Sequence, residues 1–444
     1  MSAEPVDIRA RMSDPATYDE AILRIFIKRS ARGLGFAEAA AGVTYFAAAT
    51  DRRALSRAIA ASIEDGSYRP QPVDLWYLET DGKRRAAHQA TFIDHVVGSA
   101  LFTLLSHNAR CHGLPGVYSY LPGLTNLGAM QAFGAYVRAH RKRVGPHGGP
   151  IYVLQSDFEK YGDHLPVGPD AALWQTLRLI ASLGSANGEI DARTWDLITA
   201  LVRPVVRESD GAQFTRVNGI AMGTPLVPVL GNLAALPMDQ SILSIEGVFY
   251  ARYNDDFLIA HHDLAAIQDA DARIDTSTEN LGVRRALPKE QRTALCAHGR
   301  TCAMDPSYRG RDRVDCLGLT VTAAGTVSLS PARLRRFIAR IATRIDGVSP
   351  AVSSLPVDQR AAHLVAATNV MLDPASPFAV AGLAALLDAT TDRGVLKDLD
   401  HRIARKIAQA ATRSAGVRGF RTLSPSTLYQ QFGLTSLVRS RNLR

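Results

Sequence analysis

The stretch Phe249-Tyr250-Ala251-Arg252-Tyr253-Asn254-Asp255-Asp256-Phe257-Leu258-Ile259 is the most informative part of this sequence for its fold. Two apolar runs flank the triplet Asn-Asp-Asp, and both residue types favour tight turns because their side chains bond the local backbone. The pattern predicts a β-hairpin with its turn at Asn254-Asp255. Two adjacent carboxylates at a hairpin tip repel each other unless a cation lies beside them. A solvated turn without a bound cation is the alternative interpretation.

A second apolar strand also ends in a carboxylate. The run Ile151-Tyr152-Val153-Leu154 continues through Gln155-Ser156 into Asp157. Three carboxylates at the ends of two neighbouring strands are oxygen donors of the kind that hard divalent cations prefer. With two such ions, one activates an attacking oxygen and the other stabilises the leaving oxygen of an in-line displacement. Asp157, Asp255 and Asp256 are therefore candidate catalytic residues for phosphoryl transfer.

The composition is that of an ordinary globular protein. The chain has 444 residues, of which 46% are hydrophobic and 21% charged, and this argues against a disordered, collagen-like or coiled-coil protein. Four cysteines do not make a disulfide framework, and the first residues lack the pattern of a signal peptide. The longest apolar stretch is interrupted by glycine and proline, so it is a poor membrane span. We expect a cytoplasmic protein with no membrane association.

The charge is concentrated at one end of the chain. Lys and Arg number 51 against 42 Asp and Glu, giving a net charge of +9. Residues 401–444 contain nine basic side chains and no acidic one, so this segment accounts for the whole net charge. Such asymmetry is typical of a protein that binds a polyanion, and a solvated basic tail is the alternative. The candidate nucleic-acid contacts here are Arg402, Arg405 and Lys406.

A second basic element begins at Ser330-Pro331. Serine is a favoured N-cap and proline is favoured at the first helical position, and apolar residues recur at helical spacing from 334 to 345. Arginines fall mostly off that stripe, so the pattern predicts an amphipathic helix with an arginine-rich outer face. Its candidate nucleic-acid contacts are Arg333, Arg336 and Arg340.

The remaining patterns predict a mixed α+β fold. We expect helices within the first 65 residues, a strand at 73–79 followed by a hairpin turn at Asp81-Gly82, and a helix at 192–206. Short strands at 317–321 and 326–329 precede a chain that is helical to near its end. The α+β part therefore extends to about residue 328, and a helical unit follows it.

Six blocks of the sequence, taken in order, resemble the conserved blocks of bacterial reverse transcriptases. Tyr253-Asn254-Asp255-Asp256 resembles the Tyr-X-Asp-Asp motif of that family, and Asp157-Phe158 begins a segment similar to its first catalytic block. The other blocks are Gly82-Lys83-Arg84-Arg85 with 91–97, then 118–123, 219–233 and Leu317-Gly318. One block alone would be weak evidence, whereas six in the right order make a strong match.

The resemblance implies a right-hand polymerase. Its parts would be a helical N-terminal segment at 1–40, a fingers-palm region with an antiparallel sheet and helices at 41–328, and an α-helical thumb with a basic extension at 329–444. The implied activity is that of an RNA-directed DNA polymerase, which joins a nucleotide to a primer 3′-hydroxyl with loss of pyrophosphate. Two Mg²⁺ ions, or Mn²⁺ in their place, are implied at Asp157, Phe158, Asp255 and Asp256.

The resemblance also implies a nucleotide site. Lys83 and Arg85 match the fingers position that grips the triphosphate, for which an arginine fork is suited. Gly219 and Gly223 would let the backbone approach the template and the nucleotide. The remaining positions implied to contact the nucleotide are Tyr161, Gly162, Met222 and Lys289.

Two of these positions depart from the family pattern. Gly162 replaces an aromatic residue that packs under the sugar and excludes a 2′-hydroxyl, so glycine predicts an open space there. Met222 replaces a glutamine that contacts the nucleotide. Both departures motivate an alternative, an untemplated or repeat-synthesising nucleotidyl transferase with relaxed sugar selection. A nucleic-acid-binding scaffold with a vestigial polymerase site is a further alternative, against which the intact aspartate set argues.

A compact polymerase with a helical, basic C-terminal region is similar to the defence-associated, or unknown-group, bacterial reverse transcriptases. This resemblance implies a role in antiphage defence. It also implies an RNA template, a dedicated noncoding RNA as partner, dNTPs as substrates and DNA as product. The sequence leaves the oligomeric state open.

Overall fold

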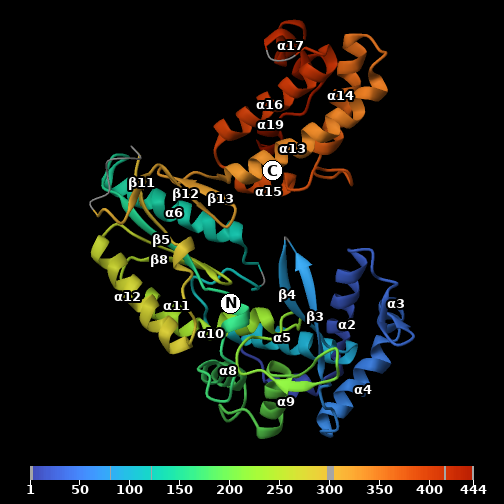
Figure 1. Ribbon diagram of the computed structural model, residues 1–444, viewed down its shortest axis with the longest axis vertical. Helices are drawn as coiled ribbons and strands as arrows, with labels where there is room; N and C mark the ends of the chain where they lie inside the picture. Colours follow the sequence, from blue (N-terminus) through green and yellow to red (C-terminus); the bar gives the residue numbers. More distant parts are fainter. Residues whose placement is uncertain (1–3, 81, 122, 298–304, 415–416, 443–444) are drawn as a thin grey trace. The chain divides into compact units, whose positions relative to one another are not determined.

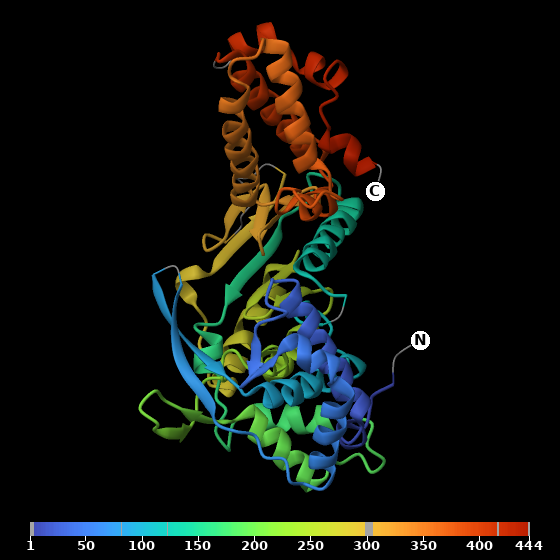
Figure 2. The same ribbon diagram turned by 90° about the vertical axis from the view of Figure 1, so that its right-hand side faces the viewer.

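The computed structural model describes residues 4–80, 82–121, 123–297, 305–414 and 417–442 (Figures 1 and 2). The protein has a mixed α+β architecture, as the sequence predicts. The chain forms two compact units, each built from two separate segments. Unit 1 contains residues 1–125 and 154–291, and unit 2 contains residues 126–153 and 292–444.

The N-terminal helices belong to unit 1. Helix α2 begins at Pro15 because the N-cap Asp14 accepts a hydrogen bond from the Ala16 N–H and proline suits the first helical position. The Val6 N–H donates to Asn108 Oδ1 at 2.8 Å, and Asn108 Nδ2 donates to the Val6 carbonyl at 3.0 Å. The predicted segment 1–40 is thus packed into unit 1. The elements are α1 (Ile8–Met12), α2 (Pro15–Ser30), β1 (Glu38–Ala40), β2 (Val43–Thr44), α3 (Tyr45–Thr50) and α4 (Arg52–Glu64).

A four-stranded sheet of unit 1 includes a long antiparallel ribbon, blue in Figure 2. The ribbon joins β3 (Val73–Thr80) to β4 (Lys83–Gln89), and this confirms the predicted hairpin, although Asp81 of its turn lies outside the described residues. Two unpredicted strands, β6 (Val205–Arg207) and β7 (Gln213–Thr215), complete the order β4-β3-β6-β7. The helix predicted to reach 206 ends at Val202, since Pro204 lacks an N–H and disfavours a helical residue before it.

The remaining helices of unit 1 lie between residues 92 and 289. They are α5 (Phe92–His112), α7 (Tyr161–His164), α8 (Leu173–Ser182), α9 (Ala192–Val202), α10 (Val227–Ala234), α11 (Leu236–Leu243), α12 (Leu264–Leu281) and the 3-10 turn η1 (Leu287–Lys289). Strand β9 (Asp256–His261) lies between β8 (Phe249–Tyr253) and β5 (Ile151–Asp157). All seven residues of β5 are buried, which explains why its first four residues form a continuous apolar run rather than an alternating one.

Unit 2 joins helix α6 (Asn126–Val144) to a group of short strands. Arg141 is buried and donates hydrogen bonds to the carbonyls of Ala323 and Leu295. Residues 126–153 and 292–328 belong to the same compact unit as the helical C-terminus, and the functional division into 41–328 and 329–444 stays a prediction. The strands are β10 (Gln291–Leu295), which begins at the last residue of unit 1, β11 (Arg309–Arg311), β12 (Arg313–Cys316), β13 (Leu319–Thr322) and β14 (Val327–Leu329).

The C-terminal helices of unit 2 pack around an apolar seam. Helix α13 begins at Pro331, with the Ser330 hydroxyl accepting from the Arg333 N–H, and it buries Phe337, Ile341 and Ile345 as predicted. The elements are α13 (Pro331–Val348), η2 (Ser349–Val352), α14 (Val357–Leu372), α15 (Leu383–Ala389), α16 (Arg393–Thr412), α17 (Val417–Thr422), α18 (Pro425–Gln430) and α19 (Leu437–Asn442). Within the described ranges, no helix combines the length and the apolar character that crossing a membrane requires.

Candidate active site

The β8–β9 hairpin forms as predicted, with Tyr253 opposite Asp256. Asn254 occupies the left-handed region at φ +62°, a conformation that asparagine tolerates better than most residues. The Asn254 side chain donates to Asp255 Oδ1 at 2.9 Å. The turn therefore presents two successive carboxylates at the end of a buried hairpin.

The third carboxylate, Asp157, lies beside this turn at the end of β5. The N–H of Phe158 donates to the Asp255 carbonyl at 3.3 Å, and the Ala286 N–H donates to the Asp157 carbonyl at 2.9 Å. These backbone bonds join three segments that are far apart in the sequence. The structure thus brings together the three carboxylates that the sequence singled out.

The electrostatics of the three carboxylates favour a cation. Burial, and then the negative charges of Asp255 and Asp157, raise the pKa of Asp256 to about 6. Asp157 Oδ1 is buried, and among the described residues it has no hydrogen-bond partner. A buried carboxylate oxygen with no partner costs free energy, and a hard divalent ion would satisfy it.

The carboxylates do not converge on a single point. Within the described ranges, no three His, Cys, Asp or Glu side chains are arranged to ligate one common ion. The side chain of Lys289 forms an ion pair with Asp157 Oδ2. An ion bound at Asp157 would therefore compete with Lys289, which is exposed enough to move, with 68% of its side-chain surface accessible.

Lys289 was predicted to bind the nucleotide, and the structure places it at the carboxylates. It ends the short turn η1. The hydrogen bond to Asp157 raises the pKa of Lys289, and the charges of Asp157, Asp255 and Asp256 raise it further. Lys289 therefore carries a positive charge directly beside the predicted metal ligands.

The side chains of Tyr161 and Phe158, predicted to contact the nucleotide and the metal, are both buried. The Tyr161 hydroxyl donates to the Gly231 carbonyl at 2.8 Å, and its ring lies 4.6 Å from that of Phe158. Only 4% of Tyr161 is exposed, so its side chain supports the floor of the site and does not reach a nucleotide. The phenyl ring of Phe158 has no donor atom, so only its backbone is available to a metal.

Met222 fills the space beside Gly162. A Cβ atom added at Gly162 would lie 2.7 Å from Met222 Sδ, which is closer than packing allows. In this structure the space expected beside Gly162 therefore holds the end of the Met222 side chain. The two departures from the family pattern are complementary, because the thioether occupies the volume that the glycine leaves.

Gly219 and Gly223 are required by close approach between parts of this chain. Both have positive φ, +86° and +107°. A Cβ at Gly223 would lie 2.5 Å from the His88 carbonyl oxygen, and one at Gly219 would lie 2.7 Å from the Asp163 carbonyl oxygen. The His88 N–H donates to the Met222 carbonyl at 2.6 Å. Sequence reasoning missed His88, which joins the β3–β4 ribbon to the segment containing Met222.

The ribbon residues predicted to grip a triphosphate lie on β4. The side chain of Lys83 lies outside the described residues. Arg85 is exposed and lies opposite Leu78 in the β3–β4 ladder. Arg84 lies opposite Glu79, and its guanidinium carbon lies 3.9 Å from the centroid of the Tyr77 ring. Since neighbouring residues of a strand point to opposite faces, Arg84 and Arg85 face opposite sides of the ribbon.

The basic residues predicted to contact nucleic acid in unit 2 differ in how they are paired. Arg402 forms an ion pair with Asp398 at 2.8 Å, and Lys406 forms one with Asp346 at 2.7 Å. Arg340 donates to the Ala381 carbonyl at 2.8 Å, and the Arg333 guanidinium packs against Gly318. Arg336 and Arg405 are exposed. The positive surface is therefore weaker than the sequence count suggests.

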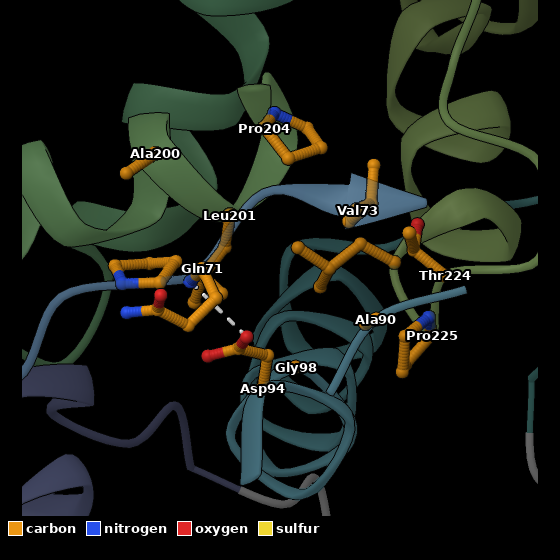
Figure 3. A pocket seen from close by; sticks show the side chains of 12 residues that line it. Gln71, Val73, Ala90, Asp94, Gly98, Ala200, Leu201, Pro204, Thr224 and Pro225 are labelled. Atoms are coloured by element: carbon orange, nitrogen blue, oxygen red, sulfur yellow. Dashed lines mark hydrogen bonds between the residues drawn. The ribbon is translucent and has the colours of Figure 1, made fainter. Parts of the chain in front are cut away.

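A small cavity in unit 1 is lined by none of the three candidate catalytic carboxylates (Figure 3). Its volume is about 20 Å³, room for one water molecule. Asp94 faces it and accepts hydrogen bonds from the Gln71 N–H at 3.1 Å and the Tyr68 hydroxyl at 2.6 Å. This carboxylate fixes the start of α5, and the cavity is too small for a substrate.

Similarity to known proteins is found among solved structures. No protein-family model and no curated protein matches the sequence. Among solved structures, apo telomerase from Candida tropicalis truncated from the C-terminal domain is similar at a TM-score of 0.45 and 10% identity, covering 61% of this chain. Telomerase from Candida albicans, in complex with a TWJ fragment of telomeric RNA, is similar at a TM-score of 0.47 and 9% identity, covering 86% of this chain. This chain spans 59% of the first telomerase and 67% of the second.

Proposed function

We propose that this protein is an RNA-directed DNA polymerase that adds nucleotides to a primer 3′-hydroxyl. The observation that carries the proposal is the meeting of Asp157, Asp255 and Asp256 at the ends of two buried strands, with one buried oxygen of Asp157 unsatisfied. Like charges held this close in a protein interior are characteristic of functional sites. The alternative of a bare solvated turn does not explain why Asp157 is buried beside it.

Asp157, Asp255 and Asp256 would hold two Mg²⁺ ions. Bound there, such ions activate the attacking oxygen and neutralise charge on the phosphoryl group. The protein itself contributes position and charge. The hairpin fixes the two carboxylates of the turn, and Lys289 supplies a cation at the same place. Catalysis of this kind depends mainly on positioning and electrostatic stabilisation.

Deoxynucleotides are the proposed substrates. Met222 closes the space beside Gly162, which weakens the case for relaxed sugar selection that the sequence alone suggested. A soft, flexible thioether adapts its shape to a neighbouring group. The alternative, a repeat-synthesising or ribonucleotide-using transferase, is an outcome of the same assay.

The test is primer extension by the purified protein on a defined RNA template, with dNTPs and rNTPs in parallel. We expect template-dependent DNA synthesis with Mg²⁺, and a loss of about a hundredfold or more in Asp255→Asn because an electrostatic group at the reacting centre is removed. Asp170→Asn, at an exposed position in unit 1, is the control and should retain activity. Product without a matching template would support the untemplated alternative, and RNA binding without any synthesis would support the scaffold.

We also propose a noncoding RNA partner and a role in antiphage defence, both resting on the sequence resemblance. Nucleic acid that co-purifies with wild-type and Asp255→Asn protein would be sequenced. A single structured RNA in both samples, with complementary DNA in wild type alone, is the expected result. Phage plating on cells carrying each variant tests the defence role. Absence of protection by the wild-type protein would contradict it, and equal protection by both variants would show that defence does not need DNA synthesis.

A further inference from the structure

We infer that a buried ion pair, Arg252 with Asp239, acts with Asn232 and Ser119 to position the turn that carries Asp255. The inference rests on the proposed function, because it assigns these residues to the same carboxylate site. None of the four touches the reacting atoms, so they are positioning residues. They form a continuous hydrogen-bonded network beneath the hairpin, hereafter the Arg252 network.

The ion pair at its centre is fully enclosed. The side chains of Arg252 and Asp239 both have 0% exposure. Arg252 Nη2 donates to Asp239 Oδ2 at 2.6 Å, and Arg252 Nε donates to Asp239 Oδ1 at 2.8 Å. The Tyr250 hydroxyl donates to the same carboxylate at 2.6 Å. This bidentate geometry fixes the plane of the guanidinium group.

The opposite edge of the guanidinium group reaches the catalytic turn. Arg252 Nη1 donates to the Asn254 carbonyl at 3.0 Å and to Asn232 Oδ1 at 3.2 Å. Arg252 Nη2 also donates to the Asn232 carbonyl at 3.2 Å. One side chain therefore connects Asp239 of α11, Asn232 of α10 and the residue immediately before Asp255.

Ser119 completes the network from a different segment of the chain. Its hydroxyl donates to Asn232 Oδ1 at 3.0 Å and accepts from the Asn254 N–H at 2.9 Å. Asn232 Nδ2 donates in return to the Ser119 carbonyl at 2.9 Å. Ser119 and Asn232 are both buried. Both backbone polar groups of Asn254 are thus bonded by side chains, the N–H by Ser119 and the carbonyl by Arg252.

This arrangement explains how a left-handed residue is kept in a single conformation. A non-glycine residue at positive φ is strained, and it persists where its surroundings over-determine it. The Asn254 side chain in turn bonds Asp255 Oδ1, so the position of the turn sets the position of that carboxylate. A buried ion pair is often no more stabilising than apolar residues of similar size. The contribution of Arg252 is therefore geometric, because its rigid guanidinium group holds its hydrogen-bond partners in fixed positions.

Ser119→Ala tests the inference with the ion pair left intact. The change removes the acceptor for the Asn254 N–H and should leave Asp255 less well placed. We expect kcat to fall about tenfold or more, since small displacements of reacting groups have large effects, while KM for dNTP changes less than about threefold. Ser106→Ala is the matched control, because the Ser106 hydroxyl is also buried in unit 1 and has no partner among the described residues.

A measurement independent of turnover separates this inference from the proposed polymerase activity. Mn²⁺ binding to the intact protein would be followed by electron paramagnetic resonance, and hydrogen exchange would be measured for the peptide spanning 249–259. Ser119→Ala should bind Mn²⁺ at least about threefold more weakly than Ser106→Ala and should exchange faster in that peptide, as the lost bond predicts. Arg252→Lys, which keeps the charge but loses the fork, should change both readouts in the same direction.

The outcomes are distinct. If the wild-type protein synthesises no DNA but the Mn²⁺ and exchange differences appear, the proposed function fails and the positioning role stands. If the wild-type protein is active and Ser119→Ala matches Ser106→Ala in kcat, Mn²⁺ affinity and exchange, the positioning role is overturned. A wild-type protein that binds no Mn²⁺ would also overturn it.

Discussion

Met222 and Gly162 form a complementary pair that neither residue would reveal alone. A glycine in an active site is usually interpreted as freedom for a ligand, yet here the thioether of another segment fills the volume. The sequence identified both positions as departures from the family pattern. It could not show that one compensates for the other, because they are 60 residues apart and meet only after the chain folds.

Met222→Ala should reduce discrimination between deoxyribonucleotides and ribonucleotides. Removing the thioether reopens the space beside Gly162, and a change of this size in a pocket alters selectivity about tenfold. The measurement is the ratio of kcat/KM for dNTP to that for rNTP on one primed RNA template. Met222→Leu, which conserves volume, is the control and should keep the ratio near that of wild type. A ratio that is unchanged in Met222→Ala would show that the sugar is selected elsewhere.

Some residues of the candidate site can be identified from a local sequence pattern, and others only from contacts in the folded structure. Asp157, Asp255 and Asp256 each follow an apolar strand, so the sequence predicted them. Ser119 lies in one of the matched blocks and His88 does not, but the sequence indicated no role for either, because their roles arise from distant partners, Asn254 and Met222. The sequence also could not show that Tyr161 is buried against Phe158 and Gly231, because an aromatic side chain near a site packs beneath it as readily as into it.

At the scale of elements, Gly223 fixes the approach of a loop to strand β4. Its φ is +107°, and the His88 carbonyl oxygen lies where a Cβ would project. The backbone of a strand cannot move aside as the end of a flexible side chain can. The segment between α9 and α10 therefore depends on this glycine for its contact with the β3–β4 ribbon.

Gly223→Ala should destabilise the protein more than Gly211→Ala does. Both glycines have positive φ, but a Cβ at Gly211 would meet nothing within 4 Å. Gly211→Ala should therefore cost about 1–2 kcal/mol from backbone strain alone, and Gly223→Ala should cost at least about 1 kcal/mol more because of overlap with His88. Urea unfolding measures the difference. Equal costs for the two variants would mean that the loop moves away from β4 at little expense.

Elements governed by local periodicity were predicted well from the sequence. The β8–β9 hairpin and α13 have strong repeats and clear boundary residues, and both are confirmed. Strands β6 and β7 have only three residues each, too few for a period to be visible. The assignment of α6 to unit 2 depends on Arg141 bonding carbonyls more than 150 residues away, which no local pattern encodes.

At the scale of the whole molecule, the excess of positive charge is partly neutralised by folding. Residues 401–444 have no acidic side chain, yet Arg402 and Lys406 are paired with Asp398 and Asp346 from outside that segment. The pair Arg402–Asp398 joins neighbouring turns of α16, whereas Lys406–Asp346 joins α16 to α13 and cannot be read from the sequence. The positive charge available to a polyanion is then concentrated on exposed residues such as Arg336 and Arg405.

Exposed arginines should therefore determine how binding of the proposed RNA partner depends on salt. Each phosphate contact contributes about 0.7–0.9 to the slope of log K against log salt. The double variant Arg336→Gln/Arg405→Gln should lower that slope by about 1.5, as measured by fluorescence anisotropy with a labelled single-stranded RNA. The control Arg402→Gln/Asp398→Asn removes a complete ion pair, leaves the net charge unchanged and should preserve the slope. If the control lost as much of the slope as the double variant, the surface ion pairs would have to open on binding. The number of basic residues in the sequence would then predict RNA binding better than the exposed arginines that are unpaired in the described part of the chain do.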